Sequence, residues 1–180
     1  MISSVIAKRV IAAIGDDSYF EDSWTLFHVE TDNARKHYSA MSQCKFDENA
    51  HVIVSIPTIG TNIYVTISEG DPGLVRRVMS TLEDIEMESS VNLGNVALLA
   101  DPDLTVREIC GVILLSSDIF NALEYVPNTL TVDKVKYTFL YFVFLTAVEH
   151  EMWKKSGHDA LMKYFFENKK DVIQFGEEIQ

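Results

Sequence analysis

The stretch HVIVSIPTIGTNIYVTI, residues 51–67, decides the fold class of this chain. It holds two runs rich in β-branched residues, His51 to Ile56 and Ile63 to Ile67, and such residues favour strands. Pro57 ends the first run, and the segment from Ile59 to Asn62 offers the glycine and asparagine that turns need. The stretch therefore predicts a β-hairpin.

A helix is expected directly after this hairpin. Asp71 can cap its N-terminus, and Pro72 suits its first turn. Apolar residues then recur at the spacing of one helix face: Leu74, Val75, Val78, Met79, Leu82 and Ile85. This pattern predicts a helix of about four turns.

Further helices are expected at both ends of the chain. Ser3 or Ser4 can cap a first helix whose apolar face ends at Ile14, with Gly15 as its stop. Near the other end, Thr146 and Glu149 have the spacing of a capping box. Gly157 is expected to divide the helix that follows, and the polar tail 169–180 is expected to fray.

Strands are expected on both sides of the central hairpin and helix. The candidates are Trp24 to Val29, Tyr38 to Cys44, Val96 to Ala100, Ile109 to Ser116 and Val135 to Leu145. Strands thus outnumber helices and do not alternate with them, which argues against a doubly wound parallel sheet. We predict an α+β fold: a single domain, residues 1–180, with a mixed, mostly antiparallel sheet and helices packed on it.

The longest strand candidate carries an aromatic block. In a strand, Tyr137, Phe139 and Tyr141 share one face, and Phe142 and Phe144 share the other. This pattern favours a central strand covered on both sides. A base-stacking platform is the alternative, but such platforms come with many basic residues, and only Lys134 and Lys136 are near.

The charge balance restricts the possible partners. The chain has 27 acidic and 15 basic residues, a net charge of -12, which repels the phosphates of nucleic acids and anionic membranes. The apolar run from Tyr137 to Val148 is shorter than the roughly 20 residues of a membrane-spanning helix. No secretory pattern is present at the N-terminus. We therefore expect a cytoplasmic protein that binds neither nucleic acid nor membrane.

Metal and cofactor motifs are missing from the sequence. Cys44 and Cys110 do not form a Cys-x-x-Cys pair, so neither a disulfide framework nor a thiolate metal site is indicated. His150-Glu151 resembles the start of a zinc-protease motif, but Lys154 stands where the second histidine belongs. His158 lies beyond Gly157, so shared coordination with His150 would need a break in the helix. We predict no metal and no cofactor.

Catalytic motifs are missing as well. The sequence has no nucleophile elbow, no phosphate-binding loop and no dinucleotide fingerprint. Paired carboxylates for acid–base work remain open, but with so many acids no pair stands out. We predict a protein that is not an enzyme, with no catalytic residue assigned.

The acidic residues are concentrated in two stretches without any Lys or Arg. One lies between Arg9 and Arg35 and holds Asp16, Asp17, Glu21, Asp22, Glu30 and Asp32; the other follows Arg77. Each stretch is either a solvated face or a binding surface for a basic partner. Acids late in a helix oppose its dipole, so local stability does not explain the four in the central helix. We predict that these four bind the partner: Glu83, Asp84, Glu86 and Glu88.

Three short phrases resemble the suppressor-of-fused domain family. The segment from Val143 to Glu151, followed by Gly157, Ala160 and Leu161, is similar to the closing strand and helix of that family, with Thr or Ala in place of its proline. Ser39-Ala40-Met41-Ser42 resembles its S-G-M-S phrase, and the segment from Gly111 to Leu115 resembles its G-V-L-L strand. The family's Trp-Pro before the central helix is Asp71-Pro72 here.

This resemblance implies a non-enzymatic α+β scaffold that holds a partner protein. Bacterial members often stand beside polymorphic toxins as immunity proteins, so we expect a protein that binds and neutralises a basic toxin or effector, as a monomer or a homodimer. Two alternatives remain at this stage. One is an export chaperone for a secreted effector, which would form homodimers with an apolar groove. The other is a carboxylate-dependent hydrolase, which would need a pocket with two perturbed acids.

Overall fold

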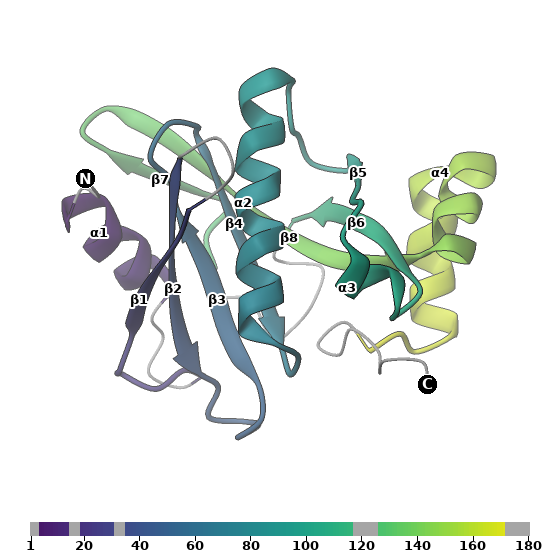
Figure 1. Cartoon of the computed structure of the whole chain (residues 1–180), viewed down its shortest axis with the longest axis horizontal. Coiled ribbons are helices and arrows are strands. Elements are labelled where there is room, and N and C mark those ends of the chain that lie inside the picture. Colours follow the sequence, from purple (N-terminus) through teal and green to yellow (C-terminus); the bar gives the residue numbers. More distant parts are fainter. Residues whose placement is uncertain (1–3, 15–18, 31–34, 117–125, 172–180) are drawn as a thin grey trace.

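An eight-stranded mixed sheet organises the part of the chain that the computed structural model describes, residues 4–14, 19–30, 35–116 and 126–171 (Figure 1). The strands lie in the order β1-β2-β3-β4-β8-β6-β5, and β7 also pairs with β8. Their bounds are Thr25–Glu30 (β1), Lys36–Gln43 (β2), His51–Ile56 (β3), Asn62–Ser68 (β4), Val96–Leu98 (β5), Ile109–Leu115 (β6), Thr129–Val132 (β7) and Val135–Thr146 (β8).

Most neighbouring strands of this sheet run antiparallel. The exception is the parallel pair of β4 and β8, which joins the first four strands to the rest of the sheet. The predicted hairpin is confirmed, because β3 and β4 pair antiparallel from His51 opposite Ser68 to Val54 opposite Val65. The strand Val135–Thr146 is interior, as expected: β4 and β7 pair with its first half, and β6 with its second.

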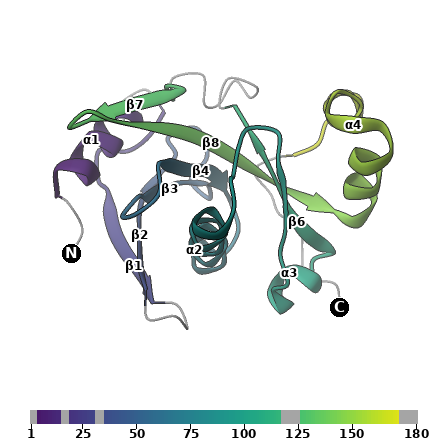
Figure 2. The ribbon, with the colours of Figure 1, turned by 90° about the horizontal axis from the view of Figure 1, so that it is seen from above.

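Two layers of helices cover the sheet. The long helix α2, Pro72–Glu88, lies along one face, and Figure 2 shows the sheet bending around it. The short helix α3, Pro102–Thr105, buries Leu104 in the same layer. On the other face, α1 (Ser4–Ile14) and α4 (Ala147–Glu167) contribute to the second core. The predicted α+β class is therefore confirmed.

The central strand β8 supplies aromatic rings to both cores. Tyr137, Phe139 and Tyr141 belong to the core that contains α1 and α4. Phe142 and Phe144 belong to the core under α2, where their rings meet edge to face at 5.8 Å. This division follows the alternation of a strand, and it confirms the interpretation of the aromatic block as core.

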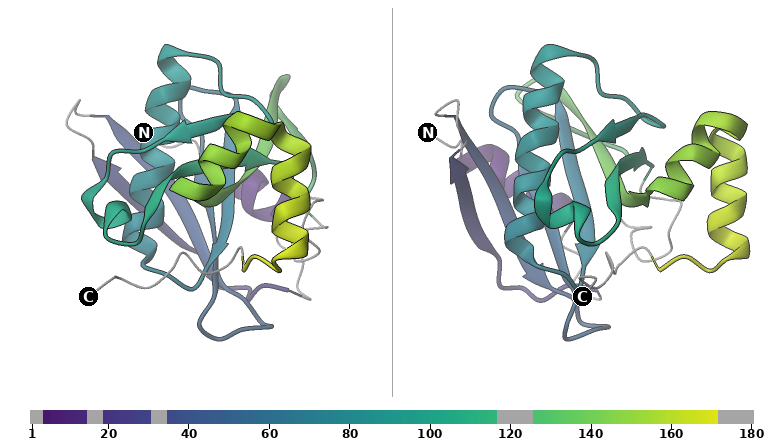
Figure 3. Two further views of the ribbon diagram at one scale, coloured as in Figure 1. Left: turned by 90° about the vertical axis from the view of Figure 1, so that its right-hand side faces the viewer. Right: turned by 45° about the vertical axis from the view of Figure 1, so that its right-hand side comes forward.

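The helix ends agree with the capping signals in the sequence. The side chain of Asp71 accepts a hydrogen bond from the amide of Gly73 and caps α2. Thr146 and Glu149 form the expected capping box at the start of α4. Gly157, with φ 85°, breaks α4 into two segments, and Figure 3 shows this bent helix standing at the end of β8, away from α2. The predicted stop Gly15 and the residues from 172 onward lie outside the described residues.

Two short elements, α3 and β7, were not predicted from the sequence. The helix α3 begins at an Asp101-Pro102 pair that matches the Asp71-Pro72 start of α2, so a signal was present. Strand β7 forms a hairpin with β8 through Asp133 and Lys134, both with positive φ. A two-residue turn of this kind usually contains glycine, and Asp133-Lys134 does not. The sequence pattern therefore did not indicate this hairpin.

Candidate functional site

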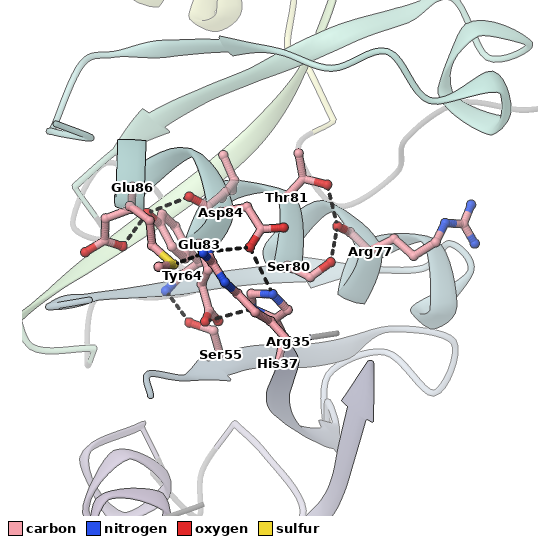
Figure 4. Close-up of polar contacts among 12 residues, drawn as sticks. Arg35, His37, Ser55, Tyr64, Arg77, Ser80, Thr81, Glu83, Asp84 and Glu86 are labelled. Atoms are coloured by element: carbon pink, nitrogen blue, oxygen red, sulfur yellow. Dashed lines mark hydrogen bonds and ion pairs between the residues drawn. The ribbon is translucent and has the colours of Figure 1, made fainter. Parts of the chain in front are cut away.

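The acidic residues late in α2 face two other elements of the fold (Figure 4). α2 packs across the sheet, so its last turns lie against β2 and against the turn between β3 and β4. Three of the four residues predicted to bind a partner, Glu83, Asp84 and Glu86, make contacts there, whereas Glu88 is exposed. The structure thus brings most of the predicted site together, but these side chains contact other parts of the same domain.

His37 of β2 lies between two of these carboxylates. Its Nδ1 is 3.1 Å from Oε2 of Glu83, and its Nε2 is 3.2 Å from Oδ1 of Asp84. The first contact has the geometry of a hydrogen bond; the second has the distance of an ion pair without that geometry. Arg35 adds an ion pair to Asp84 at 3.6 Å. This cluster ties the end of β2 to the helix.

Hydrogen bonding and burial together shift the pKa values of this cluster. His37 is 6% exposed and Glu83 is 9% exposed, so charges here are costly unless they are paired. The hydrogen bond to Glu83 raises the pKa of His37, and burial raises the pKa of Glu83. Both directions mean that the native cluster holds its protons more tightly than the unfolded chain does.

Glu86 has a structural role of a different kind. Its Oε1 accepts hydrogen bonds from the backbone amides of Thr61 (2.8 Å) and Asn62 (3.2 Å), and its Oε2 accepts one from the hydroxyl of Tyr64 (2.9 Å). Gly60 allows this approach, because a Cβ at that position would overlap the carboxylate. The side chain therefore fastens the turn of the β3–β4 hairpin to α2.

The exposure assumed for the four acids is therefore wrong for Glu83, and only partial for Asp84 and Glu86. Glu83, Asp84 and Glu86 are explained by contacts with residues 22 to 49 positions away, which helix periodicity does not reveal. Two more acids of the same stretch, Asp101 and Asp103, pair with Arg77. That the four bind a partner stays a prediction, but the placement of three of them, Glu83, Asp84 and Glu86, already has a structural reason.

A pocket of about 400 Å³ adjoins the His37 cluster. It is lined by Arg35, Lys36, His37, Tyr38, Thr58, Ile59, Gly60, Glu83 and Met87. For acid–base chemistry, Glu83 is the candidate carboxylate, but its Oε2 is held by His37 and its Oε1 is shielded from solvent. Among the described lining residues, Glu83 is the single acid. The two perturbed acids that a hydrolase would need are not brought together in this pocket.

An apolar groove lies at the other end of the sheet, between β6 and the start of α4. Two adjoining pockets of about 480 Å³ each share Ala147 and Val148. Leu99, Ile109 and Cys110 line the first pocket, and Met152 lines the second. Val148, which lines both pockets, is 67% exposed, and the exposed Leu98 and Val106 are sequence neighbours of the lining residues Leu99 and Thr105. We call this surface the β6–α4 groove.

Glu108 sits at the rim of the β6–α4 groove. It lines the first pocket and adopts φ 58°, the left-handed region that non-glycine residues seldom occupy. Such a conformation costs roughly 1–2 kcal/mol, so the surrounding turn must hold it in place. Among the described residues that line the first pocket, Glu108 is the one acid, and Glu151 lines the second.

The histidines weighed as metal ligands have separate surroundings. His150 stacks on Trp153 with ring centroids 6.1 Å apart, whereas His158 lines a pocket with Leu93, Gly94, Leu115 and Ser116. Within the described ranges, no three His, Cys, Asp or Glu side chains come together as a metal site. Likewise, no helix among them is long and apolar enough to cross a membrane.

Comparison with known proteins gives matches among solved structures. No family model and no curated protein matches the sequence. A solved structure does match: the crystal structure of a protein assigned as a homologue of SUFU (suppressor of fused protein) from Neisseria gonorrhoeae. The two structures superpose with a TM-score of 0.70, over 96% of this chain and 93% of that chain, at 13% sequence identity.

This chain has the suppressor-of-fused fold. The expectation drawn from the short sequence phrases is thereby confirmed for the fold. Those phrases lie in β2 (Ser39 to Ser42), in β6 (Gly111 to Leu115) and at the junction of β8 with α4. The last of these phrases lines the β6–α4 groove through Thr146, Ala147 and Val148, whereas the β6 residues that line it, Ile109 and Cys110, come just before the second phrase.

Proposed function

We propose that this chain is a non-enzymatic protein-binding domain that acts as an immunity protein, binding and neutralising a basic toxin or effector. The observation that supports this most directly is the β6–α4 groove. Val148 of α4, which lines both pockets, is 67% exposed, and Leu99, Ile109 and Met152 add apolar lining beside it. Exposed apolar surface next to a concave site is typical of protein interfaces.

Charge supports the choice of a basic partner. The net charge of -12 steers basic proteins toward the domain and raises the rate of association. Glu108 places a carboxylate at the apolar lining of the groove. A partner that inserts an apolar side chain beside Val148 and sets a Lys or Arg near Glu108 would satisfy both features.

The experiment that tests this proposal uses the protein encoded by the neighbouring gene. That protein is expressed with and without the domain, and growth of the host is measured. We expect the neighbour to be toxic by itself and the domain to restore growth. A neighbour without toxicity, or toxicity that the domain does not relieve, contradicts the proposal.

A pair of matched variants locates the contact. Val148→Asp puts a charge at the second residue of α4, and Val5→Asp does the same at the second residue of α1, where 51% of the side chain is exposed. Asp is well tolerated at both positions because they lie at helix N-termini. We expect Val148→Asp to weaken binding about a hundredfold and Val5→Asp to leave it unchanged. Equal effects of the two variants count against the groove.

The export-chaperone alternative is favoured by the same groove, because such a chaperone would present an apolar groove as a homodimer. The two functions differ in their outcomes. An immunity protein inhibits the activity of a purified, folded toxin, whereas a chaperone keeps an unfolded effector soluble. Size measurement by light scattering, together with the toxin's activity in the presence of the domain, separates them.

A further inference from the structure

The strand β1 lies at one edge of the sheet. It lies at the end of the strand order and pairs with β2 over six residues, from Thr25 opposite Met41 to Glu30 opposite Lys36 (Figure 1). On its other side, none of the strands in the described residues pairs with it. Alternate backbone N–H and C=O groups of β1 therefore point away from the sheet, ready to pair with another strand.

This edge lacks the features that normally protect an edge strand. Natural edges are kept from pairing by lysine, proline, a bulge or a very short strand. The sequence of β1, TLFHVE, has neither Lys nor Pro, and its register with β2 is regular. Leu26 is 51% exposed on it. The opposite edge, β5, is by contrast three residues long.

The charge around β1 indicates what kind of strand fits. Glu21, Asp22 and Glu30 are exposed at its two ends, and no Lys or Arg occurs between Arg9 and Arg35. Nearby positive charge lies behind the edge: Lys36 stands opposite Glu30 on β2, and Arg76 of α2 covers the ring of Phe27 at 4.0 Å. The other residues of this acidic stretch, Asp16, Asp17 and Asp32, lie outside the described residues.

A second copy of this chain is a poor occupant of the edge. Two β1 strands that pair antiparallel about a two-fold axis bring the Asp22 end of one strand toward the Glu30 end of the other. Like charges at both ends oppose that pairing. A basic strand meets acidic residues at both of its ends instead.

We propose that β1 accepts an extended, Lys- or Arg-rich segment of a partner protein as an additional strand of the sheet. Main-chain hydrogen bonds along the edge supply affinity, and Glu21, Asp22 and Glu30 supply the preference for basic sequences. This goes beyond the proposed function, because it concerns the opposite end of the sheet from the β6–α4 groove. It holds whether or not a partner binds in that groove.

The test uses a designed peptide as the probe and the full chain as the receptor. The peptide is acetyl-KKTVTITVKK-amide, and two controls accompany it: acetyl-EETVTITVEE-amide and the lysine peptide with alternate backbone nitrogens methylated. Affinity is measured by titration calorimetry at several salt concentrations, and amide hydrogen exchange by NMR locates the protected residues.

We expect the lysine peptide to bind and to protect alternate amides of β1. The glutamate peptide should bind at least about tenfold more weakly than the lysine peptide, and added salt should reduce this difference in affinity. N-methylation should abolish binding, because it removes main-chain donors and leaves the charges. Leu26→Lys, at an exposed position, should fold normally and bind the lysine peptide about tenfold more weakly. Val148→Asp, which alters the groove, should leave this titration unchanged.

Three results would overturn the proposal. Equal binding of the N-methylated peptide means that charge attracts the peptide without strand pairing. Protection of amides elsewhere than β1 means that another surface binds it. Protection of β1 that grows with protein concentration, without any peptide, makes a second copy of the chain the occupant.

Discussion

Replacing Glu86 by alanine removes the acceptor that fastens the β3–β4 turn to α2. Three donors lose their partner: the amides of Thr61 and Asn62 and the hydroxyl of Tyr64. Tyr64 is fully buried, and its other polar neighbours, the carbonyl of Leu82 and the side chain of Asn62, lie 3.5 Å away. The hydroxyl therefore loses its one short hydrogen bond among the described residues.

The size of the effect follows from these three contacts. A hydrogen bond to a charged group contributes about 1.5–3 kcal/mol, and the buried hydroxyl of Tyr64 loses one of them. The amides of Thr61 and Asn62 reach water more easily, so we assign about 0.5–1 kcal/mol to each. Removing an acid from the last turn of α2 returns about 0.5 kcal/mol. The net expected loss of unfolding free energy is about 3 kcal/mol, a large part of the roughly 5–15 kcal/mol of a typical domain.

Two control variants separate this explanation from a general effect of charge. Glu86→Gln keeps an oxygen for the two amides and places an NH₂ group that can donate to the Tyr64 oxygen, so we expect a loss of about 1 kcal/mol. Glu88→Ala removes an exposed acid from the same turn, and the change should stay within about 0.5 kcal/mol.

Urea unfolding at pH 7, followed by tryptophan fluorescence and circular dichroism, measures all three variants. Changes of the same size for Glu86→Ala and Glu88→Ala would refute the reasoning, because Glu86 would then be one more solvated acid. The order Ala, Gln, wild type for position 86, with Glu88→Ala near wild type, would support it. For the same reason, neutralising all four acids of α2 should destabilise the domain strongly.

Three further predictions concern the cluster, the core and metals. The pKa of His37 is raised in the folded state, so its contribution to stability is complete below about pH 6.5 and disappears as the pH rises through the folded pKa. The difference in unfolding free energy between wild type and His37→Gln should therefore shrink from pH 6 to pH 9. A difference that does not change with pH contradicts this. Phe142→Asp, at a fully buried position, should prevent folding, whereas Phe166→Asp, at a position that is 70% exposed, should give a native circular dichroism spectrum. A soluble, natively folded Phe142→Asp variant would overturn the assignment of β8 as a central strand. A chelator should leave the melting temperature unchanged, and a clear drop would restore His150 and His158 as ligand candidates.

The sequence predicted those parts of the fold that local patterns determine. The hairpin at 51–67, the cap at Asp71, the capping box at Thr146 and the two faces of β8 each depend on neighbouring residues and on one spacing rule. The elements it missed, α3 and β7, have four residues each, too few to show a period. The parallel pairing of β4 with β8 joins segments more than 70 residues apart, and no local rule specifies it.

The candidate site was harder to predict, because its contacts connect distant segments. His37 and Glu83 are 46 residues apart, and Glu86 meets the hairpin turn 22 to 25 residues upstream. A polar residue in a strand and an acid on a helix each look exposed in sequence. A signal did exist for Glu83: it lies one position after Leu82 and four after Met79, at the border of the apolar face of the helix. An acid at that border can be buried most easily when a partner such as His37 lies next to it.

The two acidic stretches of the chain thus have different physical meanings, although they look alike in sequence. In the second stretch, Glu83, Asp84, Glu86, Asp101 and Asp103 are matched by His37, Arg35, Arg77 and backbone amides within the domain. Their field is largely compensated at short range, which leaves little of it to steer a partner. In the first stretch, Glu21, Asp22 and Glu30 are exposed beside the outer edge of β1. None of the described strands pairs with the backbone groups of that edge. Glu30 faces Lys36 on β2, but the exposed Glu21 and Asp22 still lie next to open hydrogen-bonding groups. A basic partner gains both association rate and contact energy there, so the N-terminal stretch is the better place to look for charge-dependent binding.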